Sequence, residues 1–218
     1  TPYMGYKESG YYPEAFVNIL ALLGWNPGNN EELFSLEELS ALFDFERVNK
    51  SGAKFDPEKA KWFNQQYLRK HSDADLANAF KPILHSKGIE RSDAFLAEFC
   101  KLMKEKVHFV HEFWEQGHYV FEAKDDLDEK VMAKKWNDKS KALFTLVQDS
   151  FITVSDWQTQ VLHDTFEELV KVHGKIDMQL LRVLITGVAG GPQLFDLLAL
   201  LGKDEVLARL GKSLGKLN

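Results

Sequence analysis

A chain of 218 residues with a hydrophobic fraction of 44% can form one large domain or two to three small ones. Its formal net charge of −6 argues against a protein that coats nucleic acid by charge alone, so any RNA binding has to come from local basic patches and shape. The single cysteine, Cys100, excludes an internal disulfide framework and is typical of a cytoplasmic protein, and no apolar run approaches the length of a membrane helix.

Helix-start signals recur along the first third of the chain. Pro13 precedes an apolar run that stops at Gly24, which predicts a helix between them. Ser35-Leu-Glu-Glu has the spacing of a capping box and predicts a short helix that ends near Leu42. Asp56 followed by proline predicts a further helix, with the aspartate as its N-cap.

The remaining chain also has mainly helical periodicity. Ser155-Asp-Trp-Gln is a second capping-box pattern. Two short stretches, 119–121 and 151–154, favour strand by composition, and the second is expected to end a helix and lead to Ser155. We therefore predict an all-α chain with little or no sheet. The later helices are expected over residues 73–86, 92–107, 109–115, 127–136, 140–149, 155–173, 177–185, 192–201 and 204–214.

Motifs of an independent active site are missing. His108 and His111 could share a helix face and hold a metal, but no further ligand completes a known spacing, so surface or packing roles are favoured. Cys100 lies on an apolar helical stripe, and we interpret it as a packing residue. A metal-dependent helical enzyme is therefore the weakest hypothesis.

Lys101, Lys104 and Lys106 form one basic group, and two further segments have side chains suited to RNA. Lys61, Gln65 and Arg69 share one helix face at four-residue spacing, next to aromatic and amide residues that include Asn64. The other segment is Arg182 with the glycine-rich turn 186–192, which bares backbone donors and the start of the next helix. An ordinary amphipathic helix and a plain helix–helix connection are the alternatives.

Taken together and in order, several segments resemble bacterial glutamyl-tRNA synthetases over essentially the whole chain. The resemblance is strong at both ends and weak from about residue 108 to 180. It rests on Gly5–Trp25, Phe34–Leu39, Phe43–Asp44, Glu46–Val48, Phe55–Asp56, Lys59, Trp62, Asn64, Tyr67–Arg69, Leu181–Arg182, Ile185–Gly187, Pro192, Leu194–Phe195 and Leu198–Gly202.

The resemblance implies a class I aminoacyl-tRNA synthetase that uses ATP and Mg²⁺ to join glutamate to its tRNA. Neither catalytic motif of that family occurs here, and the chain begins with Thr1 rather than Met. We therefore expect a truncated C-terminal piece that holds no cofactor and is inactive by itself. Its expected parts are a stem-contact region, 1–72, and two helical anticodon-binding units, 73–129 and 130–218, arranged as a helix bundle or superhelical cage.

The resemblance also assigns roles to single positions. Arg182, Gly191, Pro192 and Leu194 match residues that contact anticodon bases, although threonine stands in place of Gly191 in one family member. Lys106 stands where the family places an arginine that reads the third anticodon base, and a lysine cannot reproduce the two-pronged contact of that arginine.

The residues on the face of the earlier helix are expected to contact the tRNA stem; they are Lys61, Asn64, Gln65 and Arg69. The implied partner is glutamate tRNA, with glutamine tRNA as an open second partner, bound by a monomeric cytoplasmic protein without a membrane role. The alternative function is a helical protein-interaction module with no RNA role, which the negative net charge favours slightly.

Overall fold

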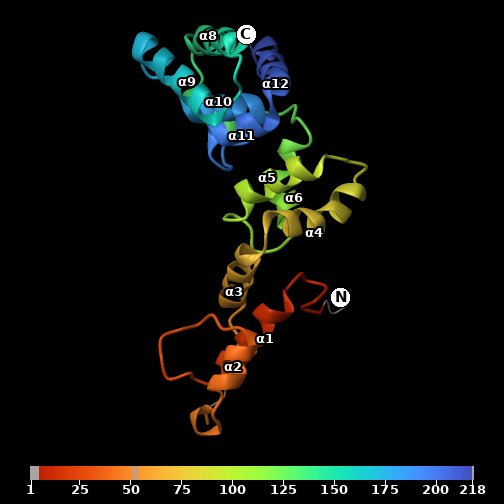
Figure 1. Cartoon of the computed structure of the whole chain (residues 1–218). Helices are drawn as coiled ribbons and strands as arrows, with labels where there is room; N and C mark the ends of the chain where they lie inside the picture. The colour runs from red at the N-terminus through yellow and green to blue at the C-terminus, as the bar shows by residue number, and fades with distance from the viewer. Residues whose placement is uncertain (1–4, 51, 53, 218) are drawn as a thin grey trace. The chain divides into compact units, whose positions relative to one another are not determined.

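The structure is a computed structural model that describes residues 5–50, 52 and 54–217. Its described residues form an all-α fold, as predicted, in which the single β feature is an isolated bridge between Trp25 and Val48 (Figure 1). The helices are α1 (Pro13–Gly24), α2 (Leu36–Leu42), α3 (Pro57–Lys70), α4 (Asp73–His85), α5 (Asp93–Met103), α6 (Glu112–Gly117), α7 (Glu129–Lys135), α8 (Ser140–Thr153), α9 (Thr159–His173), α10 (Met178–Thr186), α11 (Leu194–Leu201) and α12 (Lys203–Lys216), with short 3-10 turns at Phe45–Arg47 and His118–Val120.

The chain divides into two compact units. The first reaches Cys100 and also takes in Lys104–Trp114. The second holds Lys101–Met103 and the chain from Glu115 onwards.

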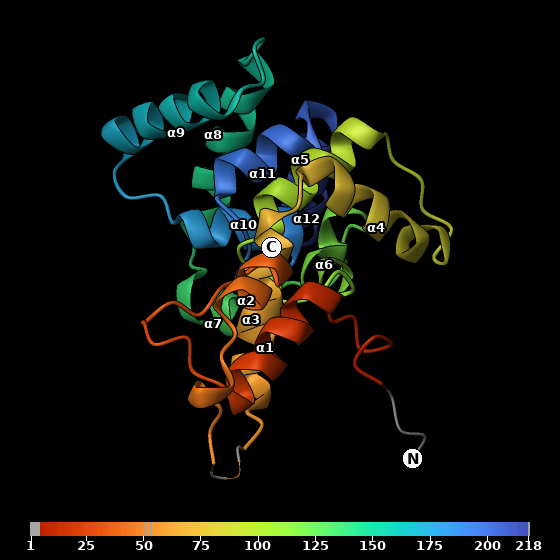
Figure 2. The same ribbon diagram turned by 60° about the horizontal axis from the view of Figure 1, so that its bottom comes forward.

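In the first unit, α1 packs along α3, as Figure 2 shows. Their shared core is formed by Ala15, Ile19, Ala60, Phe63 and Tyr67. The predicted start of α3 is confirmed, because the Asp56 carboxylate accepts hydrogen bonds from the backbone N–H groups of residues 58 and 59 at 2.9 and 3.2 Å. The capping box at Ser35 is also present and begins α2.

The helix predicted over residues 92–107 is shorter in the structure. α5 ends at Met103, and the chain after it runs beside α3. There the Gln65 side chain donates to the carbonyl oxygens of Glu105 and Val107, both at 3.2 Å. These hydrogen bonds between distant segments replace those that would have extended the helix.

The second unit surrounds one hydrophobic core formed by α8 to α12. Phe144, Val147 and Phe151 are buried along one face of α8. Because Phe151 completes this helical stripe, α8 continues to Thr153 and takes in most of the stretch 151–154 that favours strand. The other such stretch, 119–121, is largely a 3-10 turn.

The second capping box, at Ser155, does not form. α9 begins at Thr159, and its N-cap residue, Gln158, makes no side-chain capping bond. The reason is tertiary: Trp157 donates its indole N–H to the carbonyl of Leu198 at 2.9 Å and packs edge-on against Phe151. This anchor holds the preceding residues out of the helix.

Candidate nucleic-acid interface

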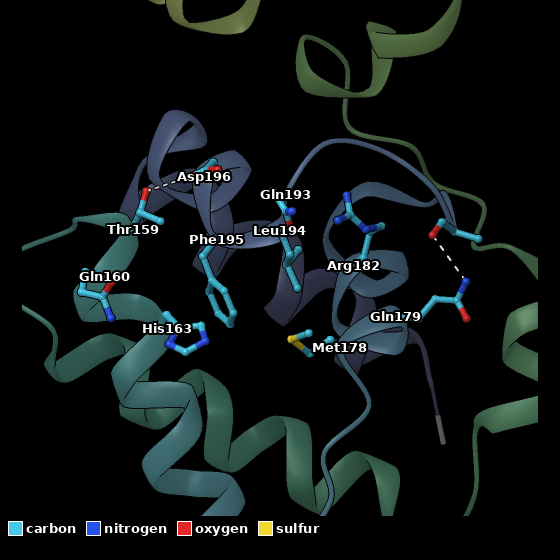
Figure 3. Close-up of a pocket in the computed structure, with 11 residues that line it drawn as sticks. Thr159, Gln160, His163, Met178, Gln179, Arg182, Gln193, Leu194, Phe195 and Asp196 are labelled. Atoms are coloured by element: carbon cyan, nitrogen blue, oxygen red, sulfur yellow. Dashed lines mark hydrogen bonds between the residues drawn. The ribbon is translucent and has the colours of Figure 1, made fainter. Parts of the chain in front are cut away.

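A pocket of about 570 Å³ opens in the second unit between α9, α10 and α11 (Figure 3). Residues of α9 form one side and residues of α10 the other, with the start of α11 between them. The lining residues are Thr159, Gln160 and His163 from α9; Met178, Gln179 and Arg182 from α10; Ala189 and Gln193 from the connecting turn; and Leu194, Phe195 and Asp196 from α11.

Local sequence signals fix the two ends of α10, which carries the basic residue of the pocket. Asp177 caps its start by accepting from the N–H groups of residues 179 and 180 at 2.9 and 3.0 Å, and it pairs with Lys135 at 2.8 Å. Gly187 ends the helix in the left-handed conformation, at a φ of 78°. Residues 178, 179 and 182 lie on the face between these ends that lines the pocket.

Arg182 is held against the turn that precedes α11. Its Nη2 donates to the carbonyl oxygen of Pro192 at 2.6 Å. Burial lowers the pKa of the guanidinium, and the nearby Tyr119 acts in the opposite direction. The group stays charged at neutral pH, since arginine does not deprotonate in proteins. The pocket therefore has one fixed positive charge at its α10 side.

The turn comes unusually close to Arg182 at Gly191. A β-carbon at this position would lie 2.6 Å from Arg182 Nη1 and 2.6 Å from the Tyr119 hydroxyl oxygen, and the φ of Gly191 is +151°. Both observations require glycine in this conformation. A threonine at this position would need a different local arrangement of the turn.

The structure thus brings together the predicted residues of the C-terminal motif. Arg182 and Leu194 line the pocket, and Gly191 and Pro192 form the turn beside it. Lys106 belongs to the first unit, where it is exposed on the segment after α5.

Several pocket residues were not predicted, above all those of α9. Thr159 donates its hydroxyl hydrogen to the Asp196 carboxylate at 2.9 Å, and the His163 ring lies edge-on to Phe195 with centroids 5.2 Å apart. No spacing in the sequence links residues 159–163 to the residues near 195, so only the fold could reveal this side of the pocket. Amide, hydroxyl and carboxylate groups around apolar surface suit an unstacked base, which offers a flat apolar face and polar edges.

The residues predicted to contact the tRNA stem have internal partners. Asn64 is fully buried, where its Oδ1 accepts from the Tyr12 N–H at 2.8 Å and its Nδ2 donates to the His108 carbonyl at 2.6 Å. Gln65 is also buried and holds the segment after α5. Both amides therefore join parts of the first unit.

The two charged members of this set lie nearer the surface. Arg69 pairs with the Glu105 carboxylate at 2.8 Å, and Lys61 pairs with Glu58 at 2.8 Å on its own helix. Lys61 and Glu58 form an exposed pair, which contributes little to stability. Arg69 is half-buried and also donates to the carbonyl oxygen of Glu105 at 3.2 Å.

The other candidate residues of the sequence have ordinary structural surroundings. Cys100 is fully buried, and burial raises the pKa of its thiol to about 12, so it packs as predicted rather than reacting. His108 lies 3.3 Å from the Glu112 carboxylate, and His111 stacks on Phe109. Within the ranges that the structure describes, no three His, Cys, Asp or Glu side chains gather in a way that could hold a metal ion, and no helix could span a membrane.

Comparison with known proteins gives a consistent result. Residues 75–214 match the anticodon binding domain family, and residues 2–62 match the catalytic domain family of class I tRNA synthetases (E and Q). The glutamate–tRNA ligase of Flavobacterium johnsoniae is 43% identical over 217 residues, which cover 98% of this chain and 43% of the ligase. The ligase of Porphyromonas gingivalis is 41% identical over 96% of this chain and 42% of its own length.

Solved structures agree. The crystal structure of a glutamate tRNA ligase from Elizabethkingia meningosepticum superposes with a TM-score of 0.92 at 34% sequence identity, over 98% of this chain and 43% of that one. The chain therefore spans less than half the length of these relatives. These matches support the RNA-binding interpretation over a protein-interaction module. The chain belongs to the anticodon-binding domain family and resembles glutamate–tRNA ligases over nearly its whole length.

Proposed function

We propose that this chain binds the anticodon loop of glutamate tRNA in the pocket between α9, α10 and α11. The observation that carries the proposal is the joint position of Arg182 and Leu194 in that pocket, beside the turn at Pro192. All three match anticodon-contacting positions of the family. The fixed guanidinium attracts RNA, and the apolar surface of Leu194 and Phe195 receives a base that has left its stack.

Local charge rather than total charge has to drive this binding. The chain carries a net charge of −6, so phosphate attraction over the whole surface is unfavourable. Binding is therefore weak, depends on salt through a small number of contacts, and gains its selectivity from base contacts in the pocket.

The other parts of the chain have supporting roles in this proposal. Residues 1–72 form a stem-contact region in which Lys61 and Arg69 meet the phosphate backbone, while Asn64 and Gln65 position that region. Residues 73–129 and 130–218 form two anticodon-binding subdomains, a division that differs from the two compact units of the structure. Lys106, in the first of these, meets the third anticodon base as a single donor, which allows weaker discrimination between glutamate and glutamine tRNAs.

In the longer protein, this chain would direct a cytoplasmic, monomeric class I ligase that attaches glutamate to its tRNA. ATP and Mg²⁺ would bind that protein's catalytic domain. The part of the chain that the structure describes has no group of three or more His, Cys, Asp or Glu side chains that could hold a metal ion. We expect no aminoacylation by the 218-residue chain alone.

Titration of the chain with two transcripts tests the proposal: glutamate tRNA and the same tRNA with an altered anticodon. We expect tighter binding of the first, and Arg182→Ala should weaken that binding about tenfold while changing the second little, as expected for one lost base contact. Equal affinity of the unaltered chain for both transcripts would contradict anticodon reading.

Arg91→Ala is the matched control, because Arg91 is an exposed arginine in the first unit. It should change both affinities equally and slightly. A uniform loss with Arg182→Ala, similar for both transcripts, would mean that Arg182 contacts phosphate rather than a base.

A further inference from the structure

Two hydrogen-bond donors beside the pocket are buried without a partner. They are the hydroxyl of Tyr119, a residue that is 2% exposed, and Nη1 of Arg182. Neither atom has a hydrogen-bond partner among the residues that the structure describes. Buried polar groups are nearly always paired, so two unpaired donors in one place call for an explanation.

Both donors face the same small space under the turn. Each lies 2.6 Å from the point that a β-carbon on Gly191 would occupy. The backbone of Gly191 therefore covers them without offering a hydrogen bond. Since Gly190 and Gly191 are adjacent and lack side chains, this part of the turn can change its backbone angles at low energetic cost.

Further hydrogen bonds fix the two residues that carry these donors. The buried guanidinium of Arg209, on α12, donates to the carbonyl oxygens of Tyr119 and Val120 at 2.6 and 3.2 Å. Arg182 is fixed through its other terminal nitrogen by the Pro192 carbonyl at 2.6 Å. The backbone of Tyr119 and the guanidinium of Arg182 are thus fixed before any ligand arrives, which lowers the entropy lost on binding.

The chemistry of the pair selects an acceptor. Burial raises the pKa of Tyr119, although Arg182 lowers it in part, so the hydroxyl keeps its proton at neutral pH. One neutral donor and one cationic donor in a water-poor site favour an oxygen that carries negative or partial negative charge. Phosphate oxygens and base carbonyls are the oxygens of this kind in RNA.

We propose that Tyr119 is a further RNA-binding residue, and that its hydroxyl and Nη1 of Arg182 together bind one RNA oxygen when the turn shifts at Gly191. This inference rests on the proposed anticodon-binding function and adds a residue to its site. The two unpaired donors disfavour the position of the turn described above, and both gain a hydrogen-bond acceptor in the complex. RNA binding and movement of the turn are therefore coupled.

Tyr119→Phe tests the inference, because it removes the hydroxyl and keeps the ring. We expect the affinity for glutamate tRNA to fall five- to tenfold, the loss of one hydrogen bond of this kind. The unfolding midpoint should stay unchanged or rise, because the hydroxyl that is lost has no partner in the free chain. A purely structural role would give the opposite pattern, with lower stability and unchanged affinity, and would overturn the inference.

Tyr67→Phe is the matched control, since the Tyr67 hydroxyl lies 2.7 Å from Asn18 Oδ1 and 2.6 Å from the Phe34 carbonyl in the first unit. It should lower stability and leave the affinity unchanged.

The source of the oxygen can be found with altered RNA. Methylphosphonates placed singly in the anticodon loop identify a phosphate oxygen, and exchange of uracil for cytosine identifies a base carbonyl. At the responsible position, the modification should weaken binding of the unaltered chain but not of the Tyr119→Phe variant. If no single modification shows this difference, the shared oxygen site is excluded.

Failure of the inference is distinguishable from failure of the proposed function. If the unaltered chain does not discriminate between the two transcripts, anticodon binding itself is wrong. If it discriminates, and Arg182→Ala abolishes the discrimination while Tyr119→Phe binds normally, only the role of Tyr119 is wrong.

Discussion

Replacement of Asn64 by alanine should cost the first unit a large part of its stability. The side chain is fully buried and satisfies two backbone groups, the N–H of Tyr12 and the carbonyl of His108. Each group left unpaired in the interior costs about 1–3 kcal/mol. The higher helix propensity of alanine returns less than about 1 kcal/mol. We therefore expect a net loss of about 1–5 kcal/mol, against a typical domain stability of about 5–15 kcal/mol.

Because the chain forms two units, the loss has to be measured in each separately. Amide hydrogen exchange during urea titration does this, with α3 reporting on the first unit and α10 on the second. The loss should appear in α3 and be absent from α10.

The matched control is Asn78→Ala, at an exposed position of α4, which should change stability by less than about 0.5 kcal/mol. A loss below about 1 kcal/mol for Asn64→Ala would refute the reasoning. If glutamate tRNA affinity fell while stability stayed constant, Asn64 would have the stem-contacting role that the family resemblance predicts.

Three further predictions concern single side chains. Ser35→Ala should destabilise the first unit by about 1 kcal/mol, the usual worth of an N-cap side chain, and urea unfolding without any change would contradict the capping role. For Asp177, burial raises the pKa, but the Lys135 ammonium and two backbone N–H groups outweigh it, so the pKa is lowered. Its stabilisation is therefore present above the unfolded-state value of about 4 and is lost as pH falls through the lower folded value. Asp177→Asn should flatten the stability profile in that window, and identical profiles would exclude the effect. Cys100 should react with iodoacetamide at pH 8 far more slowly in the native chain than in urea, because burial raises its pKa to about 12; equal rates would contradict this.

Elements with strong local signals were predictable from the sequence, and tertiary contacts explain the errors. The Ser35 and Ser155 segments share the same capping-box pattern, yet only the first forms. The difference lies in Trp157, whose hydrogen bond to Leu198 is made to a residue far along the chain. No local pattern can contain that contact, because it depends on how α9 and α11 pack.

The candidate site also has one part that the sequence predicted and one part that only the fold reveals. Arg182 and Pro192 are only ten positions apart, and a helix followed by a tight turn brings them together. The residue types and the family resemblance both predicted a binding role for this segment. The α9 side of the pocket, with His163, meets α11 only through folding. Asn64 differs again, because its burial and its two backbone partners are seen only in the fold and not in the basic, aromatic segment around it.

The Asn64 hydrogen bonds also govern how the first unit can be made. They join Tyr12, just before α1, to α3 and α3 to His108. All three segments of the chain must therefore be present before both hydrogen bonds can form. A ribosome that adds about 5–20 residues per second needs roughly 5–20 s to pass from the first partner to the last. During that time α1 and α3 can pair, but the buried amide lacks one partner. We infer that the nascent unit stays partly open until the segment after α5 has been synthesised.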